Sequence, residues 1–296
     1  MNSILKTVAD SVVDSICQRT SAVDKPRFLL GHDRSGSTWV GSTLGMAKDA
    51  IYVHEPVNET ASKIGNWTLY NSHLNPAESS AAHAKIYDRA AKGLGVRELS
   101  QKELRLRLTS KPTIIIKETG GMLLGEWFQE RYKAKIAILF RHPAGVILSN
   151  IAMDPKNAQR WFARLISQRS IIEMPIVASG LNKIAGDEDP FSQFAAVYCI
   201  RYSVVLDQLK RNPHWLRARY EDLCHDPVTE FRQLYSGLEL DWSSEIERKI
   251  IGGASSADRA ARWRDRIERN DERRIRSVLE SFSFPIYNDA ADWNSN

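Results

Sequence analysis

A glycine-rich turn between an apolar run and a helical stretch constrains the fold of this chain more than any other feature. The run is Phe-Leu-Leu at positions 28–30, and the turn that follows it reads GHDRSGSTW. A helix that starts directly after a buried strand presents unpaired backbone N–H groups and a positive dipole end to an anion. The segment therefore predicts an anion-binding loop in an α/β fold.

The turn matches a phosphate-binding loop of the G-x-x-x-x-G-K-[ST] type except at the lysine. Gly31 and Gly36 are the two glycines, and Thr38 stands where that loop has its magnesium-binding hydroxyl. Position 37 is Ser37, and the positive charge lies earlier in the turn, at Arg34. The sequence therefore favours a loop that binds a nucleotide phosphate without a metal ion.

A simple turn of small residues is the alternative, because glycines alone would fit it equally well. Polar and basic side chains surround Gly36, however, namely Arg34, Ser35, Ser37 and Thr38. That combination favours the anion site.

Length and composition place the chain among globular proteins with a large core. Its 296 residues suffice for one α/β domain with insertions, and an apolar share of 43% argues against disorder. The net charge of +5 suits an anionic ligand but is too small to predict a nucleic-acid partner. Cys17, Cys199 and Cys224 have the spacing of neither a disulfide framework nor a zinc site. We therefore expect a cytoplasmic protein without a resident metal.

Residues 1–25 predict an amphipathic helix and not a secretion signal, because acidic and polar residues interrupt their apolar positions. A helix packed on the domain is favoured over one that lies on a membrane surface or in a dimer contact. No apolar run approaches the length of a membrane span. The sequence leaves the oligomeric state open.

Five short β-type runs alternate with helical periodicity and predict a doubly wound, mostly parallel sheet. The expected strands are residues 27–30, 51–54, 113–117, 135–140 and 215–219. Ligands bind outside the carboxyl ends of such strands. Charged or aromatic residues follow every expected strand, namely Arg34, His54, Glu55, Lys117, Arg141 and Tyr220.

We expect one domain over residues 1–296, with polar, helix-leaning insertions at 60–110 and 154–190. Insertions at the mouth of an α/β sheet commonly shape the acceptor pocket. A further segment adds candidate contacts. Arg141 ends the fourth run, and Ser149 lies nearly two turns into the next helix, so the pair could hold one phosphate from two sides.

Together with the segment ARYEDL at 218–223, these motifs resemble the sulfotransferase family in order and spacing. Members of that family transfer a sulfuryl group from 3′-phosphoadenosine-5′-phosphosulfate (PAPS) to an alcohol or amine. The resemblance implies that the loop from Arg34 to Trp39 binds the 5′-phosphosulfate and that Arg141 and Ser149 bind the 3′-phosphate. It also implies that Tyr220 lies near the adenine, with Trp39 stacked on it.

The motif RSGSTW, followed by HEP, is more similar to the carbohydrate and protein-tyrosine branches of that family than to the cytosolic branch. The cytosolic branch usually has lysine at the place of Arg34. The resemblance implies that Glu55 is the general base, with the adjacent His54 as its rival. Lys117 matches a lysine of some branches and would neutralise the sulfuryl oxygens. The acceptor implied is a hydroxyl of a carbohydrate, glycolipid or natural product.

The match weakens towards the C-terminus. The family closes a Gly-rich, basic loop over the 3′-phosphate, and Gly252, Gly253, Arg259 and Arg262 resemble part of it in an unusual register. Two other functions stay open. A phosphate-loop kinase would need the missing lysine at position 37, and a non-catalytic nucleotide-binding protein would not need Glu55 or Lys117.

Overall fold

The computed structural model describes residues 25–95, 100–101, 103, 105–106, 110–253, 257–287 and 290–293. Its centre is a five-stranded sheet in the order β2-β3-β1-β4-β5, and all four neighbouring pairs are parallel. The strands are β1 (Arg27–Gly31), β2 (Ala50–His54), β3 (Thr113–Glu118), β4 (Lys135–Phe140) and β5 (Leu216–Arg219). The predicted doubly wound α/β fold is confirmed. Each strand lies within one residue of its predicted ends.

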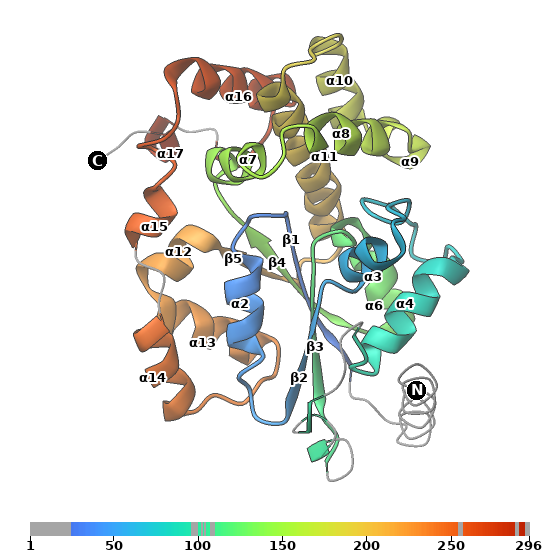
Figure 1. The fold of residues 1–296 in the computed structure, drawn as a ribbon, viewed down its shortest axis with the longest axis vertical. Coiled ribbons are helices and arrows are strands. Elements are labelled where there is room, and N and C mark those ends of the chain that lie inside the picture. Colours follow the sequence, from blue (N-terminus) through green and yellow to red (C-terminus); the bar gives the residue numbers. More distant parts are fainter. Residues whose placement is uncertain are drawn as a thin grey trace, which may run out of the picture.

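Helices cover both faces of the sheet (Figure 1). One face carries α2 (Ser37–Leu44), α12 (Tyr220–His225), α13 (Pro227–Gly237) and α14 (Ser244–Gly253), and the other carries α4 (Ala81–Ala91) and α6 (Gly125–Tyr132). The alternation of β1 explains the two cores, because Leu29 packs on the first face while Phe28 and Leu30 pack on the second. Strands buried on both faces are apolar at nearly every position, as the sequence indicated.

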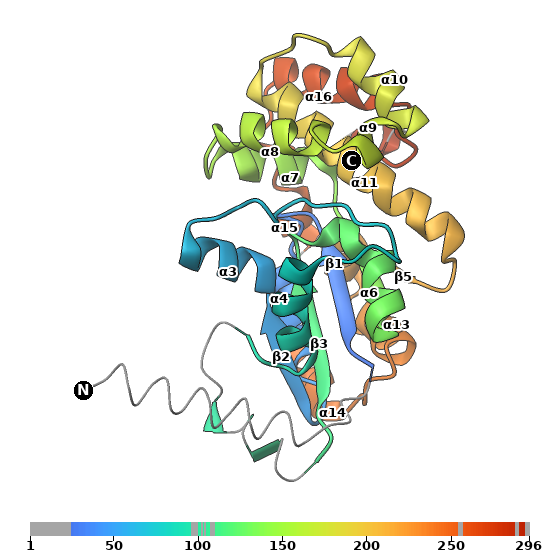
Figure 2. The same ribbon diagram turned by 90° about the vertical axis from the view of Figure 1, so that its right-hand side faces the viewer.

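A group of helices lies beyond one end of the sheet in both views (Figure 1, Figure 2). It comprises α7 (Pro143–Ile151), α8 (Asn157–Ile166), α9 (Arg169–Ile172), α10 (Pro175–Lys183), α11 (Pro190–Arg211) and α16 (Arg269–Ser281). The remaining short elements are α3 (Pro56–Ile64), η1 (Met122–Leu124), α15 (Ala257–Ala261) and α17 (Ala290–Trp293). The connections after β1, β2, β3 and β4 therefore meet in a space between the sheet and this helical group.

The long helix α11 fixes the end of β4 against the helical group. The hydroxyl of Tyr202 donates to the carbonyl oxygen of Leu139 and that of Tyr198 to the carbonyl oxygen of Arg141, both at 2.8 Å. These bonds join α11 to the last residues of β4 and to the residue after it. None of the described helices is long and apolar enough to span a membrane. The helix predicted over residues 1–25 falls almost wholly outside the described residues.

Candidate active site

The loop after β1 has the backbone shape of an anion-binding turn. Arg34 (φ 64°) and Gly36 (φ 85°) both adopt left-handed conformations, and α2 begins immediately afterwards at Ser37. No side chain caps the start of this helix. Its first N–H groups therefore remain available to a bound anion, as the sequence predicted. Ser37 is almost fully buried while Thr38 is exposed, and both line the cavity described below.

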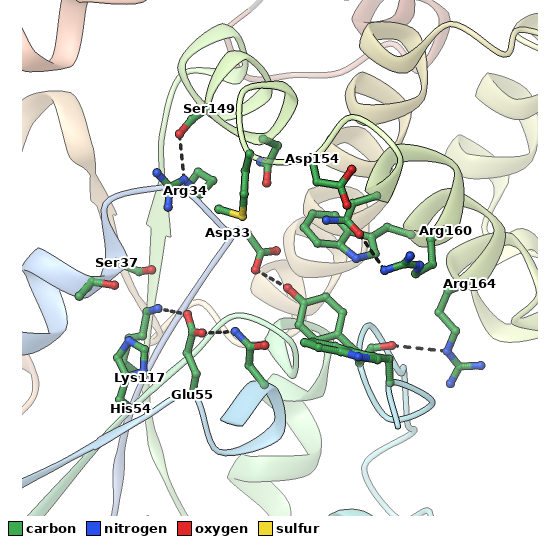
Figure 3. A pocket seen from close by; sticks show the side chains of 18 of the residues that line it. Asp33, Arg34, Ser37, His54, Glu55, Lys117, Ser149, Asp154, Arg160 and Arg164 are labelled. Carbon is green, nitrogen blue, oxygen red and sulfur yellow. Dashed lines mark hydrogen bonds and ion pairs between the residues drawn. The ribbon is translucent and has the colours of Figure 1, made fainter. Parts of the chain in front are cut away.

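Arg34, Arg141 and Ser149 come together although they belong to two different strand ends. Nε of Arg34 donates to Oγ of Ser149 at 2.8 Å, and Nη1 of Arg141 donates to the carbonyl oxygen of Arg34 at 2.7 Å (Figure 3). Ser149 reaches the loop from the second turn of α7, which Pro143 starts after β4. Two guanidinium groups and a hydroxyl thus meet at one edge of the loop, a donor set suited to phosphate oxygens.

Tyr220 supports this loop from behind. A Cβ atom placed on Gly36 would lie 2.3 Å from Cε2 of Tyr220, and the Arg141 guanidinium lies 4.4 Å from the centre of the same ring. Only glycine at position 36 therefore fits, both for this contact and for its positive φ. Trp39, in the first turn of α2, contacts Tyr220 edge to face at 5.9 Å. Tyr220 is 5% exposed, and neither aromatic residue lines the cavity.

Glu55 lies between β2 and α3, at the N-cap of the helix, in a left-handed conformation with φ 37°. Its Oε1 accepts hydrogen bonds from Nζ of Lys117 and, at 3.0 Å, from Oγ1 of Thr119, while Oε2 accepts from Nδ2 of Asn58. The Lys117 side chain is 2% exposed and that of Glu55 11%. The lysine expected at the end of β3 is thus a buried partner of the carboxylate, and both groups line the cavity (Figure 3).

His54 and Glu55 both reach the cavity, although neighbours on an extended strand point to opposite faces. The left-handed conformation of Glu55 explains this, because the chain leaves the strand at that residue. Nδ1 of His54 lies 3.5 Å from Oε1 of Glu59, and the side chain is 34% exposed. Glu55 is therefore the more enclosed of the two candidate bases.

A buried cluster behind the loop was not predicted from the sequence. Nη1 of Arg201, in α11, lies 2.6 Å from Oδ2 of Asp33, and the hydroxyl of Tyr70 donates to Oδ1 of the same carboxylate. Nη2 of Arg201 donates to the carbonyl oxygen of Thr119. Burial opposes the charge on Asp33, but Arg201, His32 and the Tyr70 hydroxyl together outweigh it and lower the pKa of that carboxyl below its ordinary value. The cluster ties α11 and the residue after β3 to the loop that follows β1.

His32 adjoins this cluster and gives it a pH dependence. Burial and the Arg201 charge lower the pKa of His32 from 6.5 to about 3. Below pH 6.5 the unfolded chain therefore binds a proton that the folded chain does not, and the free energy of unfolding falls as the pH falls. We expect a loss of about 1.4 kcal/mol per pH unit below about pH 6, measured by urea unfolding. A His32→Phe variant should reduce the slope by about this amount, while His73, His83 and His142, whose pKa values burial also lowers, keep their own contributions. If its slope equals that of the wild-type chain, the assignment to His32 is wrong.

One cavity of about 1180 Å³ joins the loop and the Glu55–Lys117 pair. Besides these groups its wall contains residues of both predicted insertions, including Trp67 and Tyr70 on one side and Asp154, Arg160 and Arg164 on the other. The volume exceeds that of a usual single-ligand pocket, about 300–1000 Å³, so it has room for a nucleotide and a second molecule.

The C-terminal candidates lie elsewhere. Arg259 and Arg262 are exposed and do not line the cavity. Trp263, between them and α16, stacks on His142 at 4.1 Å and so packs against the start of α7. Within the described ranges, no group of three or more His, Cys, Asp or Glu side chains is placed to hold a metal ion.

No protein-family model matches the chain, and no curated protein matches it in sequence. The chain is similar to solved structures that are named sulfotransferases. One is the sulfotransferase domain from the curacin biosynthetic pathway, with 18% identity, 88% of this chain and 99% of that chain covered, and a TM-score of 0.47. A second is the sulfotransferase domain from the Synechococcus PCC 7002 olefin synthase, with 16% identity, coverages of 89% and 96%, and a TM-score of 0.47. A third is mouse sulfotransferase SULT7A1 complexed with PAP, with 13% identity, coverages of 94% and 91%, and a TM-score of 0.41.

Proposed function

We propose that this protein is a sulfotransferase that uses PAPS as its donor and a hydroxyl group as its acceptor. The observation that carries the proposal is the meeting of Arg34, Arg141 and Ser149 beside a glycine loop, in the same cavity as the Glu55–Lys117 pair. The first group suits the phosphates of a nucleotide, and the second suits proton removal from an acceptor.

In this proposal the loop N–H groups and Arg34 bind the 5′-phosphosulfate, and Arg141 and Ser149 bind the 3′-phosphate. Tyr220 packs against Arg141 and Gly36 and thereby holds the arginine and the loop in place. Trp39, which lies outside the cavity against Tyr220, would stack on an adenine that extends beyond the cavity. Arg259 and Arg262 have no role in the proposed pocket.

The transfer itself needs positioning and charge stabilisation more than covalent chemistry by the protein. The acceptor oxygen attacks sulfur in line and forms the new S–O bond, while the bond between sulfur and the bridging oxygen of the 5′-phosphate breaks. Glu55 accepts the hydroxyl proton, and Arg34 stabilises the charge left on the phosphate. Lys117 lies beside the carboxylate and can turn from it to the equatorial sulfuryl oxygens. The products are a sulfate ester and adenosine 3′,5′-bisphosphate.

Donor binding is tested by thermal shift with adenosine 3′,5′-bisphosphate and with ATP, each with and without Mg²⁺. A ligand at 100 times its Kd stabilises the folded state by about 2.7 kcal/mol. We expect that stabilisation from the bisphosphate without metal. If ATP together with Mg²⁺ is the only condition that stabilises the protein, the result favours a kinase. The activity is tested by incubation with PAPS and a panel of sugars, lipids and phenols, followed by mass spectrometry for the gain of one sulfuryl group.

Arg141→Ala should weaken bisphosphate binding roughly 10- to 150-fold, because hydrogen bonds from a charged donor contribute about 1.5–3 kcal/mol. The measurement is a thermal-shift titration of the variant. Arg131→Ala is the matched control, since that arginine pairs with Asp88 at the surface and does not line the cavity. An unchanged affinity in Arg141→Ala would refute the assignment of the 3′-phosphate site.

A further inference from the structure

Two arginines on one face of α8 point into the cavity from the side opposite the phosphate-binding loop. Arg160 and Arg164 are one helical turn apart and both line the cavity. Figure 3 shows them on the opposite side of the view from Arg34 and Ser149, with Asp33 between the two groups and Glu55 below Arg34. They are therefore placed to contact the acceptor and not the phosphates of the donor.

Neither arginine has a carboxylate partner among the described residues. Nη1 of Arg160 donates only to Oδ1 of Asn157, at 3.0 Å. Arg164 donates to the carbonyl oxygens of Thr68 and Tyr70 and to a serine hydroxyl. All these acceptors are neutral. Burial lowers the pKa of Arg164, as expected for a half-enclosed cation without a counter-charge.

The other charged side chains of the cavity do not balance the positive charge of Arg160 and Arg164. Lys117 is paired with Glu55, and Asp33 is paired with Arg201 outside the cavity. Among the described residues, the third carboxylate that lines the cavity is Asp154, and its Oδ1 accepts the backbone N–H of Lys156. Two guanidinium groups therefore face one carboxylate, and this end of the cavity carries net positive charge before any donor binds.

Apolar side chains line the same cavity as the two arginines. Trp67 is 41% exposed and Met153 58% exposed, and both line the cavity. Tyr70 lies between Trp67, at 5.7 Å, and Trp161, at 5.6 Å, which makes a continuous aromatic surface. Exposed large apolar side chains beside an unpaired cation are typical of a site for a ligand that is apolar in one part and anionic in another.

Building on the proposed function, we propose that the acceptor is an anionic amphipathic alcohol. Its hydroxyl lies at Glu55, its carboxylate or phosphate is bound by Arg160 and Arg164, and its apolar part packs on Trp67 and Met153. A planar guanidinium matches either oxyanion with two parallel hydrogen bonds. Arg160 selects the acceptor, while Arg164 also holds the loop of residues 68–72 through its carbonyl contacts.

The test compares three acceptors of equal chain length: ω-hydroxylauric acid, ω-hydroxylauryl phosphate and methyl ω-hydroxylaurate. Transfer from PAPS is followed by mass spectrometry, and kcat/KM is measured for each acceptor. We expect one or both anions to exceed the neutral ester by about tenfold or more, the usual contribution of a charge-assisted hydrogen bond. The anion with the higher kcat/KM identifies the headgroup.

Arg160→Gln should reduce that preference to within about threefold, because it lowers kcat/KM for the anions more than for the ester. Arg169→Gln is the matched control, because that side chain is 87% exposed on α9 and does not line the cavity. A panel in which no anion exceeds the ester, or a preference that survives in Arg160→Gln, overturns the inference. Thermal shift with adenosine 3′,5′-bisphosphate separates the two proposals: if it stabilises the protein, only the acceptor inference has failed, and if it does not, the proposed function has failed as well.

Discussion

Glu55→Gln should lower kcat about 10²- to 10⁴-fold and leave the affinity for adenosine 3′,5′-bisphosphate unchanged, because a general base contributes about that factor to proton transfer. Glutamine keeps an oxygen for Lys117 and Thr119 but cannot accept the acceptor proton. The measurement is single-turnover transfer from PAPS at saturating acceptor. The same protein is assayed for bisphosphate binding, which reports whether the loop is intact.

Two controls distinguish the base from its neighbours. Glu59→Gln removes a carboxylate of α3 that approaches His54 but does not line the main cavity, and its kcat should stay within about threefold of wild type. His54→Gln tests the rival base in the same assay. If His54→Gln loses more activity than Glu55→Gln, the proton is accepted by the histidine and the role proposed for Glu55 is wrong.

The position of the candidate site was predictable because the carboxyl ends of parallel strands meet at one edge. The sequence indicated five strand ends, and charged residues followed them at Arg34, Glu55, Lys117 and Arg141. A parallel sheet necessarily brings such residues near one another, whatever the order of its strands. The loop at Gly36 was predicted from the glycine spacing and its polar neighbours, and the structure explains the glycine, since its positive φ and close approach to Tyr220 restrict the position to glycine.

The pairings among these residues were not predictable, because they depend on tertiary geometry. Lys117 was expected to act on the sulfuryl group, and its ion pair with Glu55 depends on the left-handed conformation of the latter. The Asp33–Arg201 pair joins residues 168 positions apart. One signal was present for it, since Arg201 is a lone cation in the apolar middle of the sequence at 194–205. A charge in such a run requires a buried partner, but the pattern does not identify which acid it is.

Asp33→Ala should lower the free energy of unfolding by about 3 kcal/mol, because it leaves the guanidinium of Arg201 buried without a counter-charge. The Arg201 side chain is 0% exposed, whereas that of Asp33 is 13% exposed and lines the cavity. Water from the cavity can approach the empty position, which places the effect at the lower end of the range for a broken buried pair, about 3–5 kcal/mol. Urea unfolding near neutral pH measures it.

Asp88→Ala is the matched control, because Asp88 also accepts from an arginine, but both side chains of that pair are more than 40% exposed. Exposed pairs contribute about 0–1 kcal/mol, so this variant should unfold close to wild type. The double variant Asp33→Ala/Arg201→Met removes both charges and fills the volume of the arginine with an apolar side chain, and it should recover much of the stability lost in Asp33→Ala. A double variant no more stable than Asp33→Ala would mean that the loss comes from the Tyr70 hydrogen bond or from the cavity created. In that case the uncompensated charge of Arg201 would not be the cause of the stability lost in Asp33→Ala.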